Sequence, residues 1–180
     1  LSEQGELQLA RDCFEKARRI RPDFAEASFN LGHALQELED YEAAAEAYEA
    51  ALAARPDYVD ALSNLGMTLH FLDRDDEAFT CFERAVALDS QHQAAYLNIG
   101  CILLDRAQAR EALPFLEQAY KLAPDNANTN NELARACKNL DSPAETEFSV
   151  RAIELAPNSA AADASRVRLA IRCYLNGQDT

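Results

Sequence analysis

Three asparagines recur at one fixed interval, each just before a Leu-Gly or Ile-Gly pair. They are Asn30 in "SFNLGHAL", Asn64 in "LSNLGMTL" and Asn98 in "YLNIGCIL". A carboxamide carries both a donor and an acceptor, so it can bond to the N–H and C=O groups of a peptide backbone regardless of the ligand's side chains. The interval therefore predicts a row of backbone-binding groups, provided that the surrounding elements hold them in line.

Two helical stretches per interval would position this row. In the first copy, apolar residues recur with the spacing of one helix face on both sides of the polar turn "ELEDY". They are Leu31, Gly32 and Leu35 before the turn and Ala44, Tyr48 and Ala51 after it. The next two copies repeat this pattern around Gly66 and Phe82 and around Gly100 and Leu116.

The repeated glycines predict close crossings between helices. A glycine inside a helix costs about 1 kcal/mol relative to alanine, so three at equivalent positions need a compensating contact. Where helices cross near the lower end of the usual interaxial distance of roughly 8 to 10 Å, only glycine or alanine leaves room.

The prolines should mark helix ends. Each second helix should end at Pro22, Pro56 or Pro124, because the ring removes a donor and clashes with the preceding turn. Pro114 falls near the start of a predicted helix, where we expect a mild kink at most.

This recurring pattern of leucine, glycine, alanine, aromatic and proline positions resembles the tetratricopeptide repeat, a helix-turn-helix unit of about 34 residues. The resemblance implies an all-α fold, a right-handed α-solenoid of helix-turn-helix repeats with a C-terminal capping helix, forming a single domain over 1–180. The expected repeats are 25–58, 59–92, 93–126 and a degenerate repeat at 127–159. In the degenerate repeat Ala134 replaces the glycine, Cys137 replaces the leucine, and one residue is lost, which leaves the register of its second helix open.

The two ends depart from the repeat. Residues 1–24 match only a second helix, and the chain begins with Leu1, so we expect its first helix to lie upstream. The apolar stripe of this leading helix should then be covered by upstream residues, another chain or a neighbouring molecule. The stripe consists of Leu7, Ala10, Phe14 and Ala17. Residues 160–176 are expected to form the capping helix, whose apolar face comprises Val167, Ala170, Ile171 and Tyr174.

The family resemblance also implies that the first helices line a concave groove, with the residue before the Leu-Gly pair facing into it. A row of asparagines there resembles the asparagine ladder of the O-GlcNAc transferase repeats. The matching position of the fourth repeat carries Glu132, so the ladder ends or shifts there. The other positions expected to bind a peptide are Phe29, His33, Met67, His70, Asn131 and Arg135. The alternative is that the asparagines bond water or a neighbouring helix, and that the histidines are hydrated or packed.

Motifs for catalysis, phosphate binding and metal binding are missing from the sequence. It has no GxSxG, HExxH or GxGxxG, and no two Cys or His residues lie within four positions of each other. We therefore expect no catalytic residue, no metal and no cofactor.

Five widely spaced cysteines without a CxxC favour a reducing compartment and a cytoplasmic location. No apolar run approaches the length of a membrane span.

The charge balance disfavours nucleic acid and anionic membranes as partners. There are 17 Lys and Arg against 31 Asp and Glu, a net charge of −14, whereas binding to nucleic acid or an anionic membrane needs lysine and arginine to displace counterions. The acidic surface either keeps the protein solvated or attracts a basic partner.

The leading interpretation is a non-catalytic protein-protein interaction scaffold that binds an extended peptide segment in its groove. Three residues of polyproline II, at about 3.1 Å each, match the roughly 9 to 10 Å expected between successive asparagines.

Two alternatives stay open. The end "AIRCYLNGQDT" resembles the junction between repeats and a methyltransferase domain in bacterial proteins, which implies a substrate-recruiting module of a larger methyltransferase or glycosyltransferase. The uncovered leading helix instead favours a homo-oligomer.

Overall fold

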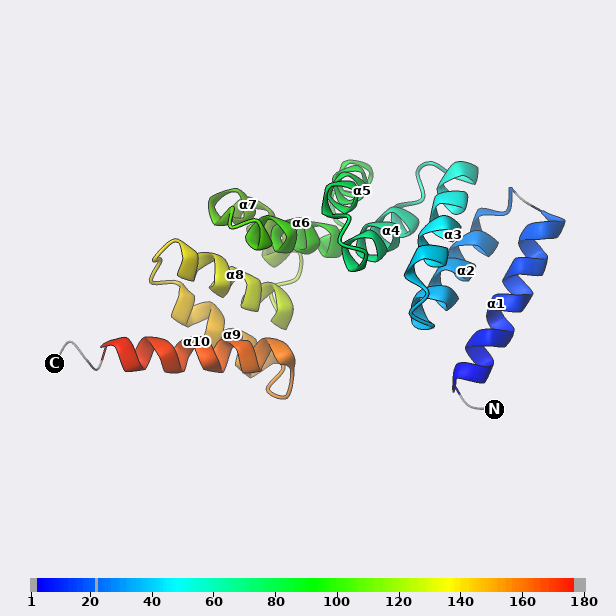
Figure 1. Ribbon diagram of the computed structural model, residues 1–180. Helices are drawn as coiled ribbons and strands as arrows, with labels where there is room; N and C mark the ends of the chain where they lie inside the picture. Colours follow the sequence, from blue (N-terminus) through cyan, green and yellow to red (C-terminus); the bar gives the residue numbers. More distant parts are fainter. Residues whose placement is uncertain (1–2, 22, 177–180) are drawn as a thin grey trace. The chain divides into compact units, whose positions relative to one another are not determined.

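The structure is a computed structural model that describes residues 3–21 and 23–176, and these residues form ten helices and no strand. The all-α fold expected from the sequence is therefore confirmed (Figure 1). The helices are α1 (Glu3–Ile20), α2 (Ala25–Glu37), α3 (Tyr41–Ala54), α4 (Val59–Phe71), α5 (Asp75–Leu88), α6 (Gln93–Asp105), α7 (Ala109–Leu122), α8 (Ala127–Asn139), α9 (Glu145–Leu155) and α10 (Ala160–Asn176).

Helices that follow one another pack as pairs, as α2 does with α3, α4 with α5 and α8 with α9. We call α2, α4, α6 and α8 the first helices and their successors the second helices. The first helices begin at a constant interval, whereas α10 begins one residue earlier than this interval would place it. Pro56 and Pro124 follow the ends of α3 and α7 as expected, α7 continues through Pro114, and Pro22 lies outside the described residues.

A residue in the left-handed conformation ends the first helix of each pair. These residues are Glu39, Asp73, Ala107 and Asp141, with φ of 60, 57, 60 and 53°. The next residue donates its backbone N–H back to the helix, as Asp40 does to the carbonyl of Leu35 at 3.0 Å and Gln108 does to Leu103 at 2.8 Å. This bond satisfies a carbonyl that the helix end would leave without a partner, and it is typical of the Schellman motif.

The glycine of each first helix packs under a large side chain of the paired second helix. A Cβ on Gly32 would lie 2.7 Å from the ring of Tyr48, closer than real contacts allow. The same relation joins Gly66 to Phe82 and Gly100 to Leu116. The close crossings that the repeated glycines predict are therefore confirmed.

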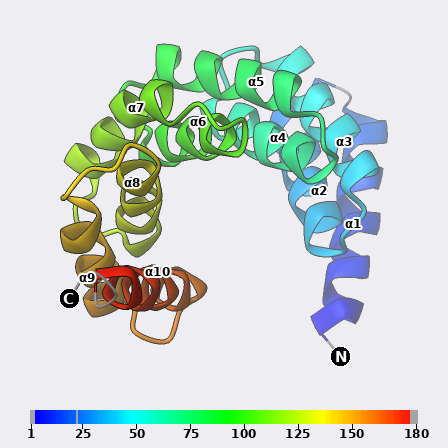
Figure 2. The same ribbon diagram turned by 60° about the vertical axis from the view of Figure 1, so that its left-hand side comes forward.

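The chain forms two compact units, residues 1–95 and residues 96–180, which we call the first and second units. In the first unit α2 and α4 contact each other on one side, and α3 and α5 lie on the other (Figure 2). In the second unit α8 packs against α7, α9 and α10. The assignment of 1–180 to one domain of repeats stays a sequence prediction.

The leading helix α1 packs against α2, and this contact changes the expectation for its apolar stripe. All four residues of that stripe are half-buried rather than exposed. The apolar residues that α1 does expose are Leu9 and Ile20, which are 58% and 85% exposed.

The capping helix α10 turns inward a different face from the one expected. Val167 and Ile171 are 59% and 44% exposed, whereas the residues buried against the neighbouring helices are Ala161, Ala162 and Ser165. The expectation that the larger apolar residues face inward was wrong, because small side chains let α10 approach α8 and α9 closely. The side chain of Tyr174 lies outside the described residues.

Candidate functional site

The two asparagines of the first unit have different surroundings. Asn30, on α2, is exposed and has no hydrogen-bond partner among the residues that the structure describes. Asn64, on α4, is half-buried, and its Nδ2 donates to the hydroxyl of Tyr48 at 3.4 Å. That hydroxyl in turn donates to Oε1 of Gln36 at 3.2 Å.

This arrangement sets the orientation of the Asn64 carboxamide. The Tyr48 hydroxyl gives its proton to Gln36, so it can only accept from Asn64, and the amide nitrogen rather than the oxygen must face it. Burial raises the pKa of Tyr48 to about 12, so the hydroxyl keeps its proton at neutral pH. Asn64 therefore has its Oδ1 left to accept a hydrogen bond from a ligand.

Phe29 belongs to an aromatic cluster beside these asparagines. Its ring centroid lies 5.7 Å from that of Tyr48 and 4.9 Å from that of Tyr58. The Arg55 guanidinium covers Tyr58 at 3.7 Å from the ring centroid and pairs with Glu26 at 3.1 Å. The cluster holds Phe29 half-buried, with part of its ring left for contact with a ligand.

Three other residues of the first unit, His33, Met67 and His70, are predicted to bind a ligand. Among the described residues, none of them forms a hydrogen bond with Asn30 or Asn64. His33 is exposed and Met67 is half-buried. His70 lies with its Nδ1 2.6 Å from Oδ1 of Asp75, so it joins the end of α4 to the start of α5. A role for these three residues in binding stays a prediction.

In the second unit a cavity of about 330 Å³ lies between α6, α8 and the start of α10. Its walls are formed by Leu97, Asn98 and Cys101 of α6, Asn128, Asn131 and Glu132 of α8, and Ala160 and Ala161 of α10. The fold thus brings Asn98 and Asn131, both predicted from the sequence as binding residues, to one cavity.

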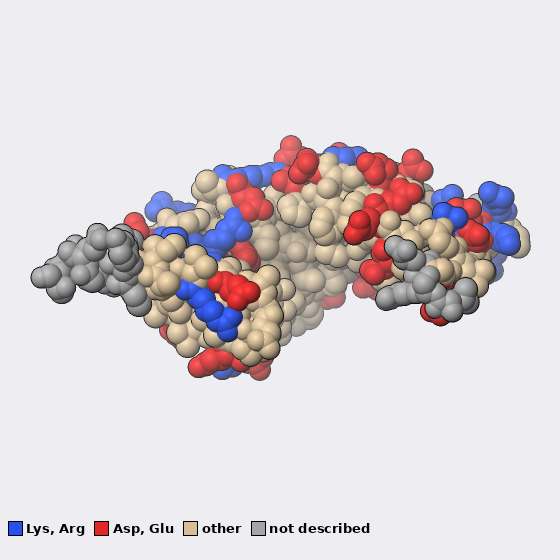
Figure 3. Space-filling model, turned by 60° about the horizontal axis from the view of Figure 1, so that its bottom comes forward, with Lys and Arg blue, Asp and Glu red and all other residues tan. Residues whose placement is uncertain are grey.

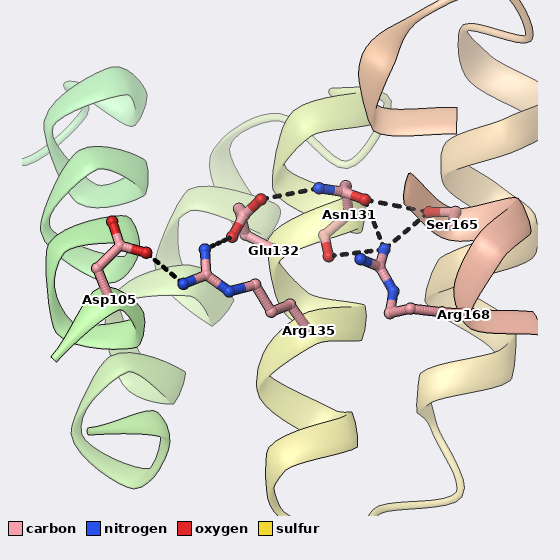
Figure 4. A network of polar contacts seen from close by, with 6 residues as sticks. All are labelled: Asp105, Asn131, Glu132, Arg135, Ser165 and Arg168. Carbon is pink, nitrogen blue, oxygen red and sulfur yellow. Dashed lines mark hydrogen bonds and ion pairs between the residues drawn. The ribbon is translucent and has the colours of Figure 1, made fainter. Parts of the chain in front are cut away.

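A continuous chain of polar contacts accompanies this cavity (Figure 4). Arg135 pairs with Asp105 and, at 3.0 Å, with Glu132, whose other oxygen accepts from Nδ2 of Asn131 at 2.8 Å. Oδ1 of Asn131 accepts from the Ser165 hydroxyl at 3.2 Å and from Arg168. Arg135, predicted as a ligand-binding residue, is therefore engaged by two carboxylates of the protein itself.

The sequence interpretation missed Ser165 and Arg168 as members of this chain. The residue lost from the fourth repeat could have indicated them. Because of that loss, α10 begins one residue earlier than the repeat interval predicts. With that shift, Ser165 and Arg168 take the positions on α10 that Glu132 and Arg135 take on α8. Burial lowers the pKa of Arg168.

The site offers binding groups rather than reactive ones. Burial raises the pKa of Cys101 to about 12, with Glu132 and Asp105 adding to the effect, so the thiol stays protonated and is a poor nucleophile at neutral pH. Within the described part of the chain, no three His, Cys, Asp or Glu residues are placed to hold a metal ion. None of the described helices is both long and apolar enough to cross a membrane.

Negative charge is unevenly distributed between the units. Residues 1–95 contain 20 Asp and Glu against 8 Lys and Arg, a net charge of −12, whereas residues 96–180 contain 11 against 9, a net charge of −2. Figure 3 shows the acidic side chains in separate clusters, some of them beside Lys and Arg. A basic ligand would therefore be attracted mainly by the first unit.

Three family models match the chain, and together they span residues 1–126. Models described as "Tetratricopeptide repeat" match residues 29–93 and 93–126, and one described as "TPR repeat" matches residues 1–39. A search of curated proteins found no match.

Several solved structures have a similar fold. The crystal structure of MamA has a TM-score of 0.78 at 18% identity, covering 84% of this chain and 89% of that one. YrrB, described as "a TPR protein with an unusual peptide-binding site", has a TM-score of 0.74 at 24% identity, covering 92% and 86%. TTC0263, a thermophilic TPR protein of Thermus thermophilus, has a TM-score of 0.69 at 22% identity, covering 92% and 90%. At these identities the similarity establishes the fold alone.

Proposed function

Because the chain belongs to the tetratricopeptide repeat family, we propose that it is a non-catalytic scaffold that binds an extended segment of another protein along its first helices. The observation that carries this proposal is the free hydrogen-bonding capacity at one repeated position. Asn30 and Asn98 have no partner among the described residues, and Asn64 keeps its Oδ1 free. The description of YrrB as a peptide-binding TPR protein supports the same function.

The packing of the helices suits an extended ligand. In the first unit α2 and α4 contact each other and carry Asn30 and Asn64 at equivalent positions. Helices packed side by side are roughly 8 to 10 Å apart, and three residues of polyproline II rise about 9 Å. A polyproline II segment would therefore present the same face to Asn30 and then to Asn64.

Backbone hydrogen bonds alone give this ligand modest affinity. Each contributes about 0.5 to 1.5 kcal/mol net, and part of that gain offsets the ordering of the segment. Side-chain contacts must supply the selectivity, and in the first unit we propose Phe29, His33 and Met67 for them, since each keeps exposed surface.

The proposal is tested on an array of proline-containing peptides probed with the labelled full chain. Asn64→Ala should weaken binding to every positive peptide by about three- to tenfold, since one net hydrogen bond is lost. The triple substitution at Asn30, Asn64 and Asn98 should abolish it, whereas Asn139→Ala, an exposed asparagine at the end of α8, should change nothing. Unchanged binding by the triple variant would refute the asparagine row.

Self-association is a second candidate, favoured by the exposed Leu9 and Ile20 on α1. Light scattering over a range of concentrations separates it from peptide binding, because a strict monomer rules it out. Recruitment for a larger enzyme rests on the sequence resemblance of the C-terminal end alone.

A further inference from the structure

The cavity between α6, α8 and the start of α10 has the size of a pocket for one part of a ligand. Its volume of about 330 Å³ is at the lower end of the range for small-molecule sites, roughly 300 to 1,000 Å³. Helices bound it on two sides and the first turn of α10 bounds it on a third. It is open to solvent, with Asn128 exposed at its edge, and its size suits one side chain of a bound segment.

The polar groups that face this cavity have hydrogen-bonding capacity to spare. Asn98 and Asn128 line it, and neither has a hydrogen-bond partner within the described residues. Each offers two N–H donors and an acceptor oxygen. Glu132 adds acceptor capacity, because a carboxylate has about four lone-pair sites and only two donors among the described residues, from Asn131 and Arg135, engage it.

The charges around the cavity are already balanced. Asp105 and Glu132 are paired by Arg135, and Arg168 brings a second positive charge beside Asn131. The side chain of Glu132 is only 15% exposed. A cationic side chain entering here would lose water without gaining an unpaired carboxylate, and an anionic one would meet the carboxylate of Glu132, while Arg168 is already held by Asn131 and Ser165.

The rest of the lining is apolar. Leu97 and Cys101 lie on α6, and Ala161 is buried at the start of α10. The Cys101 thiol stays neutral, so it packs as a small hydrophobic group. These residues suit the methylene groups of a side chain whose polar end reaches the asparagines.

From this combination we propose that the cavity is a selectivity pocket for an uncharged carboxamide side chain, that of glutamine or asparagine, in the bound segment. A carboxamide matches the lining because its two N–H groups and its oxygen can each meet a complementary group of Asn98, Asn128 or Glu132. The inference rests on the proposed function and adds to it the kind of residue that the second unit prefers.

The test is an NMR titration of the full chain with the N-acetyl methylamides of glutamine, glutamate, lysine and norleucine. The signals to follow are the side-chain NH₂ groups of Asn98 and Asn128, assigned by their loss in Asn98→Ala and Asn128→Ala. The glutamine probe should shift both signals, with a dissociation constant at least about threefold below those of the other probes. Each alanine variant should weaken glutamine binding by about three- to tenfold, and the control Asn139→Ala, on α8 outside the cavity, should not.

Two outcomes would overturn the pocket. One is equal or tighter binding of glutamate, lysine or norleucine; the other is no shift of either signal in millimolar excess of any probe. Failure of the pocket is separable from failure of the proposed function. If the chain binds arrayed peptides through Asn30 and Asn64 but does not bind the glutamine probe, only the pocket is refuted. If it binds the glutamine probe but no arrayed peptide, only the proposed scaffold function is refuted.

Discussion

A hydrogen bond to a neighbouring helix decides what Asn64 can offer a ligand. The Tyr48 hydroxyl accepts from the amide nitrogen of Asn64, so Asn64 can offer a ligand its acceptor oxygen. Asn30 has no partner among the described residues, so it can offer both its donor and its acceptor groups. The residues that stand before Asn30 and Asn98 as Tyr48 stands before Asn64 are Phe14 and Phe82, which have no hydroxyl group. The restraint is therefore particular to Asn64, and the three asparagines are chemically unequal despite their equal spacing.

Replacing Tyr48 with phenylalanine tests this restraint. The ring and its contact with Gly32 are kept, but the bonds to Asn64 and Gln36 are lost, so the free energy of unfolding at neutral pH should fall by about 1 kcal/mol. Chemical denaturation measures this change. Tyr41→Phe is the matched control, because Tyr41 stacks on Phe71 and no hydrogen bond to a described residue is assigned to its hydroxyl.

The same variant makes a pH-dependent prediction. The pKa of Tyr48 is about 12 in the folded chain against an ordinary value of 10.0, so the unfolded chain loses this proton first as pH rises. Stability from this group is complete below pH 10 and is lost between pH 10 and about 12. The difference between the native protein and Tyr48→Phe should therefore narrow at pH 11, and a constant difference would contradict the assignment.

Each helix pair depends on a tight turn that this chain builds without glycine. The four left-handed residues that close the first helices are Glu39, Asp73, Ala107 and Asp141. Aspartate tolerates this conformation better than most residues, whereas the Cβ of alanine makes it unfavourable by roughly 1 to 2 kcal/mol. The backbone bonds of the Schellman motif and the packing of the pair hold Ala107 in this strained state.

Ala107→Gly should relieve that strain. We expect the free energy of unfolding to rise by about 1 kcal/mol, measured by chemical denaturation, because glycine adopts a positive φ without steric cost. The matched control is Ala170→Gly at an exposed position inside α10, where the same change should lower stability by about 1 kcal/mol. A loss of stability on Ala107→Gly would show that the turn is unstrained.

Over the whole molecule, electrostatic repulsion is concentrated in residues 1–95, which carry a net charge of −12. Exposed ion pairs such as Arg74 with Glu77 and Arg11 with Asp12 offset little of this repulsion, because such pairs are typically worth 0 to about 1 kcal/mol. The excess of carboxylates should therefore destabilise the folded chain at low ionic strength.

Added KCl should raise the melting temperature at pH 7 for this reason. Raising the ionic strength from about 0.01 to about 0.15 M shortens the Debye length from roughly 30 to roughly 8 Å and screens the carboxylates from each other. A gain of about 1 kcal/mol corresponds to roughly 2 to 4 °C for a chain of this size. Near pH 4.5, the isoelectric point, the rise should vanish, and an equal rise at both pH values would contradict the explanation.

Part of the candidate site could be predicted from the sequence, since position on a repeating helix face is a local property. Periodicity places Asn98 and Asn131 on first helices, and in the structure both line one cavity. The bond from Asn64 to Tyr48 and the contacts of Arg168 with Asn131 could not be anticipated in this way. They join residues far apart in the sequence and on different helices, and a lost residue shifts the register before Arg168.

The all-α fold, the family and the close crossings at glycine can be predicted from the amino-acid order alone, because each follows from spacings within about one turn of a helix or from the fixed repeat interval. Which groups remain free to bind a ligand depends instead on how the helices pack together. Packing buries Ser165 rather than Val167 on α10, and it leaves Asn98 and Asn128 without partners among the described residues, beside a cavity whose carboxylates are paired with Arg135. A side chain's partner depends on the distance and angle between helices, and these are set by packing across the whole interface rather than by any local pattern.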